Sequence, residues 1–311
     1  MGLCCARRAL RSKWIAPRVL KNVGEPLPST LLRTVSLSNR VGSRGAGEMQ
    51  EQLKEIYELN NSLLQLAENL QDEFSKRKIK RDTLTADLSL LCFFFAKASK
   101  TASVVVLLCQ NGCYAEDALV LVRTIFEIVA RSSYIFKSDS INRARDYILY
   151  DNFEIRKQLR KVTKWHKKNN VENREVEEEL ENVETDCETL EKDLQINRDN
   201  VIWPKKKLEE LSIKEVDLGN IYYTFYWISS LYCHTSMRSS KSYVSESEEG
   251  ISFDIKPNQQ LAKDVLIWLF DLFRLMAREF DNRFNLGYRE KISKVEEEFN
   301  KFMLKSAMNE K

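Results

Sequence analysis

The chain has 311 residues, of which 43% are hydrophobic and 31% are charged, a balance typical of a globular protein and not of a disordered one. The net charge of +3 is unevenly distributed, because residues 1–48 carry nine basic and two acidic side chains, which leaves the rest of the chain at −4. A mildly acidic body does not bind phosphate backbones over its whole surface, so any contact with nucleic acid would be local.

Glycine and proline, the residues that mark turns, are concentrated in the same N-terminal leader. Five of the nine glycines and three of the five prolines precede residue 48. Because β-sheets need turns every few residues, the sparse turn residues of the remaining chain favour long helices. The sequence therefore predicts an all-α fold, with a single multi-helix bundle domain over residues 49–311.

The leader itself is rich in Arg and Ser and is interrupted by prolines. This composition is typical of a mitochondrial transit peptide, whereas Gly2 followed by Cys4 and Cys5 leaves lipid acylation as a second interpretation. A third is an over-long gene model, since Met49 directly precedes a well-formed helix. We expect residues 1–48 to be disordered or cleaved. The expected location is cytoplasmic, or mitochondrial if the leader is a transit peptide.

The cysteines and histidines give no sign of a metal site. The seven cysteines are odd in number, and apart from the adjacent Cys4 and Cys5 of the leader only Cys109 and Cys113 are closely spaced, which favours reduced thiols in an intracellular compartment. The two histidines, His166 and His234, are far apart in the sequence, and no pair of cysteines has the spacing of a zinc site. We therefore expect neither a metal nor a cofactor.

The first part of the body predicts three helices. Residues 50–76 place apolar side chains at steps of three and four, the pattern of an amphipathic helix. Residues 83–109 contain two apolar runs that Lys97 and Lys100 interrupt, so neither run reaches the about 20 residues that a membrane-spanning helix requires. Residues 115–136 are apolar nearly all round, as expected of a helix at the centre of a bundle.

The next segment, residues 141–200, is highly charged. A basic block at 156–168 precedes an acidic block at 172–193, and Asn169–Asn170 lies between them. Opposite charges on consecutive helices predict an antiparallel hairpin whose arms attract each other. The simplest interpretation of this hairpin is a solvated surface element.

After Trp203-Pro204 the pattern returns to helices. Residues 220–244 predict an unusually aromatic helix, and residues 245–257 a surface loop or small hairpin. Residues 258–282 predict a strongly amphipathic helix, capped after a proline. The last predicted helix, residues 288–304, is charged, and we expect it to be less well anchored.

Two places carry polar residues that a plain bundle does not need. Arg123 and Glu127 lie four residues apart on the apolar helix 115–136, where a charge is costly unless it is paired. They either form a buried structural ion pair or line a polar pocket in which Arg123 binds an anion.

The second place is one stripe of the aromatic helix 220–244. At 3.6 residues per turn this stripe contains Tyr223, Trp227, Ser230, His234 and Arg238. An imidazole, a hydroxyl and a guanidinium one turn apart suit acid–base chemistry with phosphate stabilisation. The alternative is a core histidine satisfied by Ser230 or by a backbone carbonyl. If the two helices pack together, Arg123, Glu127, Ser230 and His234 form one polar cluster.

These residues carry a resemblance to a known family. Helix 115–136, with Arg123, Glu127 and Tyr134, resembles the first signature of a largely bacterial helical family, the domain of unknown function five-six-seven-seven. The second signature resembles the stretch from Trp203-Pro204 through Tyr222–Tyr226 to Ser229–Ser236. The resemblance covers about residues 85–280. It implies an all-α fold and no established activity, with shared polar positions at Arg123, Glu127, Ser230 and His234.

More distantly, the arrangement is similar to the helical domains of the higher-eukaryote and prokaryote nucleotide-binding type, many of which are RNA-cutting toxins or defence proteins. Active members carry Arg and then His on one helix, with four to six residues between them. Here His234 comes before Arg238, with three residues between them. The likeness therefore implies nuclease chemistry only if Arg123 supplies the guanidinium from the neighbouring helix.

Two functions from different classes fit these residues. In the first, the protein cleaves RNA without a metal, with His234 as the acid or base, Arg123 or Arg238 on the phosphate and Glu127 orienting one of them. In the second, the protein is a non-catalytic scaffold or interaction module, and the same residues join two core helices. The expected partner is accordingly RNA or another protein.

Overall fold

The computed structural model describes residues 46–80, 83–110, 112, 114–194, 207–234, 240, 243–247, 250–253 and 256–309. The contacts divide these residues into two compact units. The first contains the described residues up to Val129 and from Leu218 onward, and the second is Ala130–Asp217. The predicted all-α fold is confirmed, whereas the extent of the domain, residues 49–311, stays a prediction. The leader lies outside the described residues except for 46–48, which belong to the first helix.

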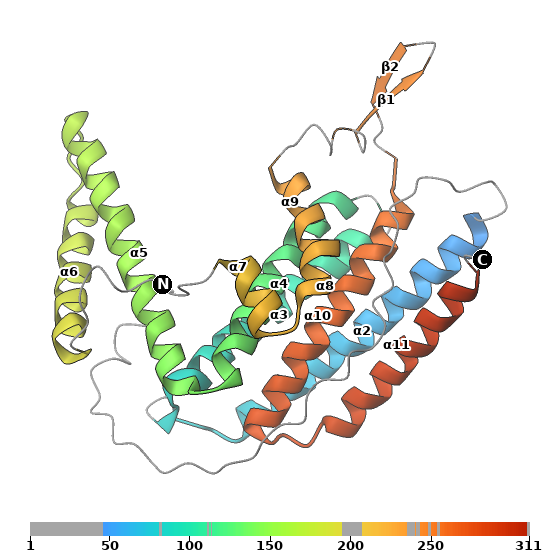
Figure 1. The fold of residues 1–311 in the computed structure, drawn as a ribbon, viewed down its shortest axis with the longest axis horizontal. Coiled ribbons are helices and arrows are strands. Elements are labelled where there is room, and N and C mark those ends of the chain that lie inside the picture. Colours follow the sequence, from blue (N-terminus) through green and yellow to red (C-terminus); the bar gives the residue numbers. More distant parts are fainter. Residues whose placement is uncertain are drawn as a thin grey trace. The chain divides into compact units, whose positions relative to one another are not determined.

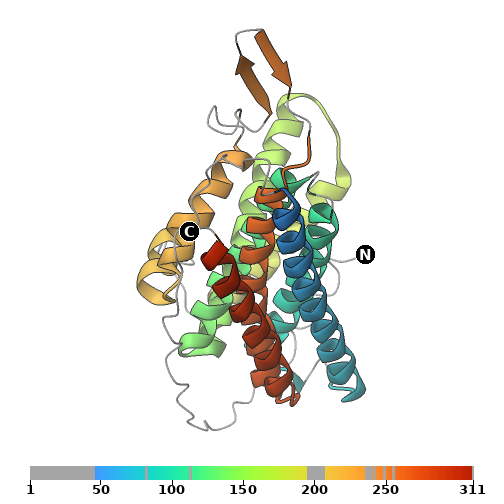
Figure 2. The same ribbon diagram turned by 90° about the vertical axis from the view of Figure 1, so that its right-hand side faces the viewer.

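The first unit is built around one central helix. It contains α2 (Ala46–Lys76), α3 (Ala86–Cys109), the first part of α4 (Ala115–Lys137), α10 (Gln259–Phe284) and α11 (Arg289–Asn309). α10 packs against α2, α3 and α11, and the three helices α2, α10 and α11 lie side by side (Figures 1 and 2). Because it has neighbours on several sides, α10 is buried continuously from Leu261 to Phe270.

Aromatic rings fill the contacts of α10. Phe280 stacks on Phe95 of α3, with ring centroids 4.1 Å apart. Phe270 stacks on Phe299 of α11 at the same separation. The expectation that the last helix is poorly anchored is therefore wrong. Its charged sequence hides a narrow apolar face, and Glu296 on the same helix also forms ion pairs with Arg274 and Arg278 of α10.

α3 is the one described helix that is long and apolar enough to cross a membrane, by length and composition alone. Half of its most apolar window is buried inside the protein. Phe94, Phe95 and Val105 are among its buried residues. This is the pattern of a core helix, and the two apolar runs predicted for this segment form one continuous helix.

The close approach of the start of α10 explains why residue 112 is a glycine. Asn258 caps the helix, because its side-chain oxygen accepts a hydrogen bond from the Leu261 N–H at 3.0 Å. Its own N–H donates to the carbonyl of Gly112 at 2.9 Å. Gly112 has a φ of +70°, and a Cβ at this position would lie 3.3 Å from the backbone nitrogen of Gln259. Glycine therefore fits both the backbone conformation and the close approach here.

The aromatic helix ends earlier than predicted. The helical run comprises α8 (Gly219–Ile221), the π-helical segment η5 (Tyr222–Tyr226) and α9 (Trp227–Cys233). The expected end at Val244 is wrong, because this residue begins strand β1 (Val244–Ser247). The residues after His234 are rich in Ser and Thr, which favour caps and turns over helix. β1 pairs antiparallel with β2 (Gly250–Phe253), which confirms the small hairpin.

The second unit contains the charged hairpin, α5 (Ser140–Lys168) and α6 (Arg174–Leu194), which lie side by side (Figure 1). Arg156 pairs with Glu191 at 3.3 Å and Arg160 with Glu184 at 2.8 Å, so the arms are antiparallel and attract each other as predicted. Asn170, with a φ of +53°, lies in the connection between them. The short helix α7 (Leu208–Glu210) and the π-helical segment η4 (Leu211–Glu215) complete the unit.

Candidate functional site

α4 holds two charged residues within a buried apolar surface. Leu119, Val122 and Phe126 on this helix are completely buried, because they face the core of the first unit. Arg123 and Glu127 lie one turn apart next to this surface, with side chains 20% and 24% exposed. The pair is thus neither a solvated surface pair nor sealed in the core.

Arg123 contacts two residues of the aromatic helix. Its Nη2 donates to the Tyr226 hydroxyl at 2.8 Å, and its Nη1 donates to the Cys233 sulfur at 3.3 Å. The guanidinium also lies over the Tyr226 ring, 4.8 Å from the centroid, where the negative face of the ring attracts the cation. Nη2 is 3.5 Å from Glu127 Oε1, so the expected ion pair is present.

Tyr226 connects the two charges. Its hydroxyl accepts from Arg123 and donates to Glu127 Oε1 at 3.2 Å. Its ring packs against Phe126, with centroids 5.1 Å apart. We call Arg123, Glu127, Tyr226 and Cys233 the polar cluster. In this cluster the Tyr226 hydroxyl hydrogen-bonds to both the Arg123 cation and the Glu127 carboxylate, and packing against Phe126 fixes the Tyr226 ring.

Burial sets the protonation state of this phenol. Burial raises the pKa of Tyr226, and the hydrogen bond from Arg123 opposes the shift only in part, so the hydroxyl stays neutral at physiological pH. For Arg123, burial alone would lower the pKa, but the hydrogen bond with Tyr226 and the charge of Glu127 raise it overall. The cluster therefore holds the permanently charged Arg123 guanidinium beside the neutral Tyr226 hydroxyl.

One side of the aromatic helix faces α4. Tyr226 and Cys233 hydrogen-bond to Arg123, and the rings of Tyr222 and Phe225 also pack against α4. Tyr226 and Cys233 are seven residues apart, two turns of a regular helix, and so share a face. The residues of the predicted stripe, Tyr223 and Trp227, lie on another face and are exposed.

The structure brings together only part of the predicted cluster. The Ser230 hydroxyl donates to the Tyr226 carbonyl at 2.8 Å and so belongs to its own helix. His234 is exposed and ends α9, with its N–H bonded to the Ser230 carbonyl. In the described part of the chain its imidazole makes no hydrogen bond with Arg123. Arg238 lies outside the described residues.

Sequence reasoning missed Tyr226 and Cys233. Neither residue type is unusual on an aromatic helix, and only the packing of this helix against α4 shows that these two lie toward Arg123. One further feature could not be predicted. The Nε atom of Arg123 is buried and has no hydrogen-bond partner within the described residues. A buried donor without a partner is costly, so this nitrogen is a weak point of the cluster.

The chain was compared with known proteins after this geometry was established. A family model, described as Family of unknown function (DUF5677), matches residues 88–251, more than half of the chain. The chain belongs to this family. No curated protein and no solved structure matches. The family match includes α4 and the whole polar cluster, and it confirms the resemblance found in the sequence. The likeness to the nucleotide-binding helical domains stays a prediction.

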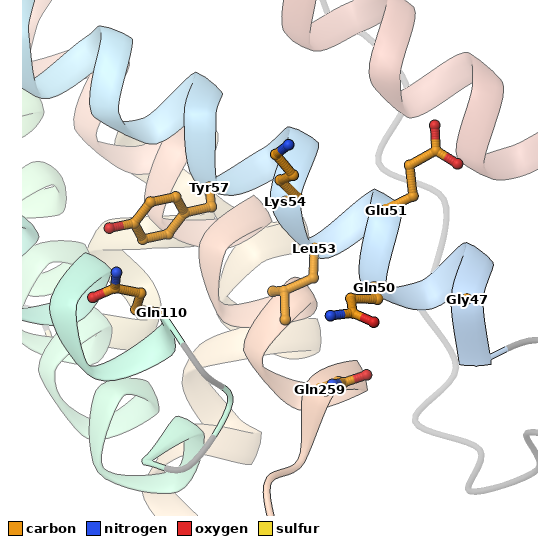
Figure 3. Close-up of a pocket in the computed structure, with 8 residues that line it drawn as sticks. All are labelled: Gly47, Gln50, Glu51, Leu53, Lys54, Tyr57, Gln110 and Gln259. Atoms are coloured by element: carbon orange, nitrogen blue, oxygen red, sulfur yellow. The ribbon is translucent and has the colours of Figure 1, made fainter.

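A second candidate lies mostly outside the family match. A pocket of about 530 Å³ is open near the N-terminal end of α2. Figure 3 shows Tyr57 of α2 pointing toward Gln110, and Gln50 toward Gln259 at the start of α10. Its walls are mainly amides and flexible charged side chains, with no fixed charge like that of Arg123. We therefore take the polar cluster as the candidate functional site.

Within the described residues no group of three or more His, Cys, Asp or Glu side chains is placed to hold a metal ion.

Proposed function

We propose that the protein acts on RNA as a metal-independent, endoribonuclease-like protein of the defence type. The observation that carries the proposal is the contact of Arg123 with Cys233, because the next residue in the chain is His234. The contact brings the end of α9 to the guanidinium. A fixed cation and an imidazole near one another are the parts that phosphodiester cleavage without metal requires.

In this proposal Arg123 holds the phosphate and Glu127 and Tyr226 hold Arg123. The part of the Arg123 side chain that remains exposed, 20%, is where a phosphate oxygen would bind. His234 takes the proton from the ribose 2′-hydroxyl, whose oxygen forms a bond to the adjacent phosphorus. The bond from phosphorus to the 5′-oxygen breaks, and the protonated imidazole returns its proton to that oxygen. The products are a 2′,3′-cyclic phosphate and a 5′-hydroxyl, and no oxidant or metal enters the balance.

The non-catalytic module is the second candidate, and a specific observation favours it. Both terminal nitrogens of Arg123 are already engaged, one by Tyr226 and one by Cys233. In that case the polar cluster only fixes the aromatic helix against α4, and this structural role explains the cluster without any substrate. The two candidates differ in what removal of His234 does, since this exposed residue holds nothing in place.

The test is incubation of the purified full chain with total RNA in the presence of EDTA. We expect cleavage by the native protein and its loss in His234→Ala, with an unchanged unfolding curve. Thr224→Ala is the matched control, because the Thr224 hydroxyl bonds only to its own helix, at Asn220. If the native protein did not cleave RNA, or if His234→Ala cleaved it fully, the nuclease proposal would be contradicted. The non-catalytic interaction module would then be the remaining candidate.

A further inference from the structure

The outer face of α5 carries a continuous row of basic residues and one tryptophan. All of its members are exposed: Lys157, Lys161, Lys164, Trp165 and Lys168. At 100° per residue these positions fall within an arc of about 100° on one side of the helix. We call them the basic stripe. From first to last residue the stripe is about 17 Å long, at 1.5 Å of rise per residue.

The acidic arm α6 does not neutralise this stripe. α6 pairs with two arginines that lie to one side of the stripe, Arg156 and Arg160. Lys157 has a partner on its own helix, Glu154, at 3.3 Å. The other three lysines of the stripe make no ion pair with any residue that the structure describes. The ion pairs between the arms therefore leave most of the stripe without a counter-charge.

Trp165 is the second, independent observation. Its side chain is 58% exposed, although tryptophan is among the residues that gain most from burial. Its only ring contact in the described residues is an edge contact with His166, with centroids 5.5 Å apart. An open indole face between lysines, one turn from each neighbour along the stripe, is an arrangement on which a base stacks while cations hold the backbone.

We propose that the basic stripe binds single-stranded RNA, with the lysines on successive phosphates and one base stacked on Trp165. An anionic membrane fits less well, since a helix that lies on a membrane offers a broad apolar face, and this stripe has a single aromatic residue. An acidic protein segment would satisfy the lysines but has no base for the indole. The proposal goes beyond the polar cluster and does not depend on the chemistry at Arg123.

The test is the affinity of the full chain for a fluorescein-labelled 12-nucleotide oligouridine, followed by fluorescence anisotropy at several salt concentrations. The chain carries His234→Ala so that cleavage does not interfere. Four phosphate contacts on a single strand predict a slope of log affinity against log salt of about −2.8. Trp165→Ala should lower the affinity about tenfold. Changing Lys161, Lys164 and Lys168 to Gln should reduce the slope by about 2.

Two matched controls exclude general effects of charge and of exposed aromatics. Changing Lys100, Lys294 and Lys301 to Gln removes the same charge from exposed positions on α3 and α11. Tyr114→Ala removes an aromatic side chain that is also 58% exposed. Neither should change the affinity more than twofold, and far-ultraviolet circular dichroism should show all variants folded.

Three outcomes would overturn the proposal: an equal loss in the control triple variant, an affinity unaffected by Trp165→Ala, or binding to phosphatidylserine vesicles but not to the oligonucleotide. The proposed function fails separately. Stripe-dependent binding by a protein that does not cleave RNA contradicts only the nuclease. Cleavage of RNA with an affinity that the stripe variants leave unchanged contradicts only the basic stripe.

Discussion

At the scale of single residues, the polar cluster depends on three side chains that satisfy one another. Arg123 has two acceptors on the aromatic helix, and Tyr226 in turn donates to Glu127. Removing Arg123 takes a hydrogen-bond donor from the part-buried Tyr226 hydroxyl, and a buried polar group that loses a partner costs more than the lost hydrogen bond itself. The cluster should therefore behave as a unit in stability measurements.

Arg123→Ala is the direct test of that unit. We expect it to lower the free energy of unfolding by about 2 kcal/mol, because it removes both the ion pair with Glu127 and the hydrogen bond to Tyr226. Tyr226→Phe keeps the ring and should cost about 1 kcal/mol. Urea unfolding measures both. Arg289→Ala, at an exposed position of α11, is the control. A loss for Arg123→Ala no larger than that of the control would contradict the cluster.

The cysteines give a second prediction at this scale, through pKa values that burial raises. The pKa of Cys92 rises to about 11 and that of Cys109 to about 12, chiefly because burial disfavours the thiolate. Since the thiolate is the reactive form, at pH 8 fewer than about one in a thousand of these groups is ready to react. Alkylation of the native protein should label exposed Cys233 before Cys92 and Cys109.

The readout is mass spectrometry of iodoacetamide-treated protein with and without urea. Urea should remove the protection of Cys109. The same shift makes the stability of the fold depend on pH. The pKa of Cys109 is higher in the folded than in the unfolded chain, so the folded state is favoured by the neutral thiol. This contribution to the free energy of unfolding is complete below pH 9 and is lost as the pH rises toward 12. Cys109 labelled in the native protein as fast as Cys233 would show that the helix opens locally.

Sequence patterns revealed Arg123 and Glu127 because charges stand out on an apolar helix. They did not reveal Tyr226, because periodicity groups the residues of a helix into faces but does not say which face packs against α4. The roles predicted for Ser230 and His234 from the helical stripe and the family resemblance stay predictions.

At the scale of elements, junctions are fixed by backbone conformation. Gly112→Ala should lower the free energy of unfolding by about 1–2 kcal/mol, because alanine disfavours a positive φ and its Cβ approaches Gln259. Gly47→Ala is the matched control. Nothing lies within 4 Å of the added Cβ, and alanine is the better helix former in α2. Thermal unfolding should show opposite signs for the two variants, and equal melting temperatures would contradict this.

For α11 the sequence and the structure lead to different expectations of how firmly the helix is anchored. Its charged composition indicates weak anchoring, whereas Phe299 is buried and stacks on Phe270. Phe299→Ala should therefore cost about 3 kcal/mol in urea unfolding. Leu304→Ala, on the same helix but 58% exposed, should cost well under 1 kcal/mol. If both variants lowered the free energy of unfolding by a similarly small amount, α11 would be weakly anchored after all.

At the scale of the whole molecule, scarcity of Gly and Pro and the apolar periodicity were enough to predict the helical class and most helix positions. Local patterns contain no information on long-range partners, so the central place of α10 and the two compact units could not be predicted. The separation of charges on α5 is an intermediate case. The sequence shows the basic block, and only the pairing with α6 shows which of its residues face solvent.

The central claim is that the polar cluster and His234 cleave RNA through the ribose 2′-hydroxyl. The most direct measurement is mass spectrometry of the ends formed when the full chain cuts a short RNA in EDTA. A 2′,3′-cyclic phosphate with a 5′-hydroxyl is the predicted result, and a substrate with 2′-deoxyribose at the cut site should stay intact. A 3′-hydroxyl with a 5′-phosphate, or cleavage of the deoxy substrate, would contradict the account.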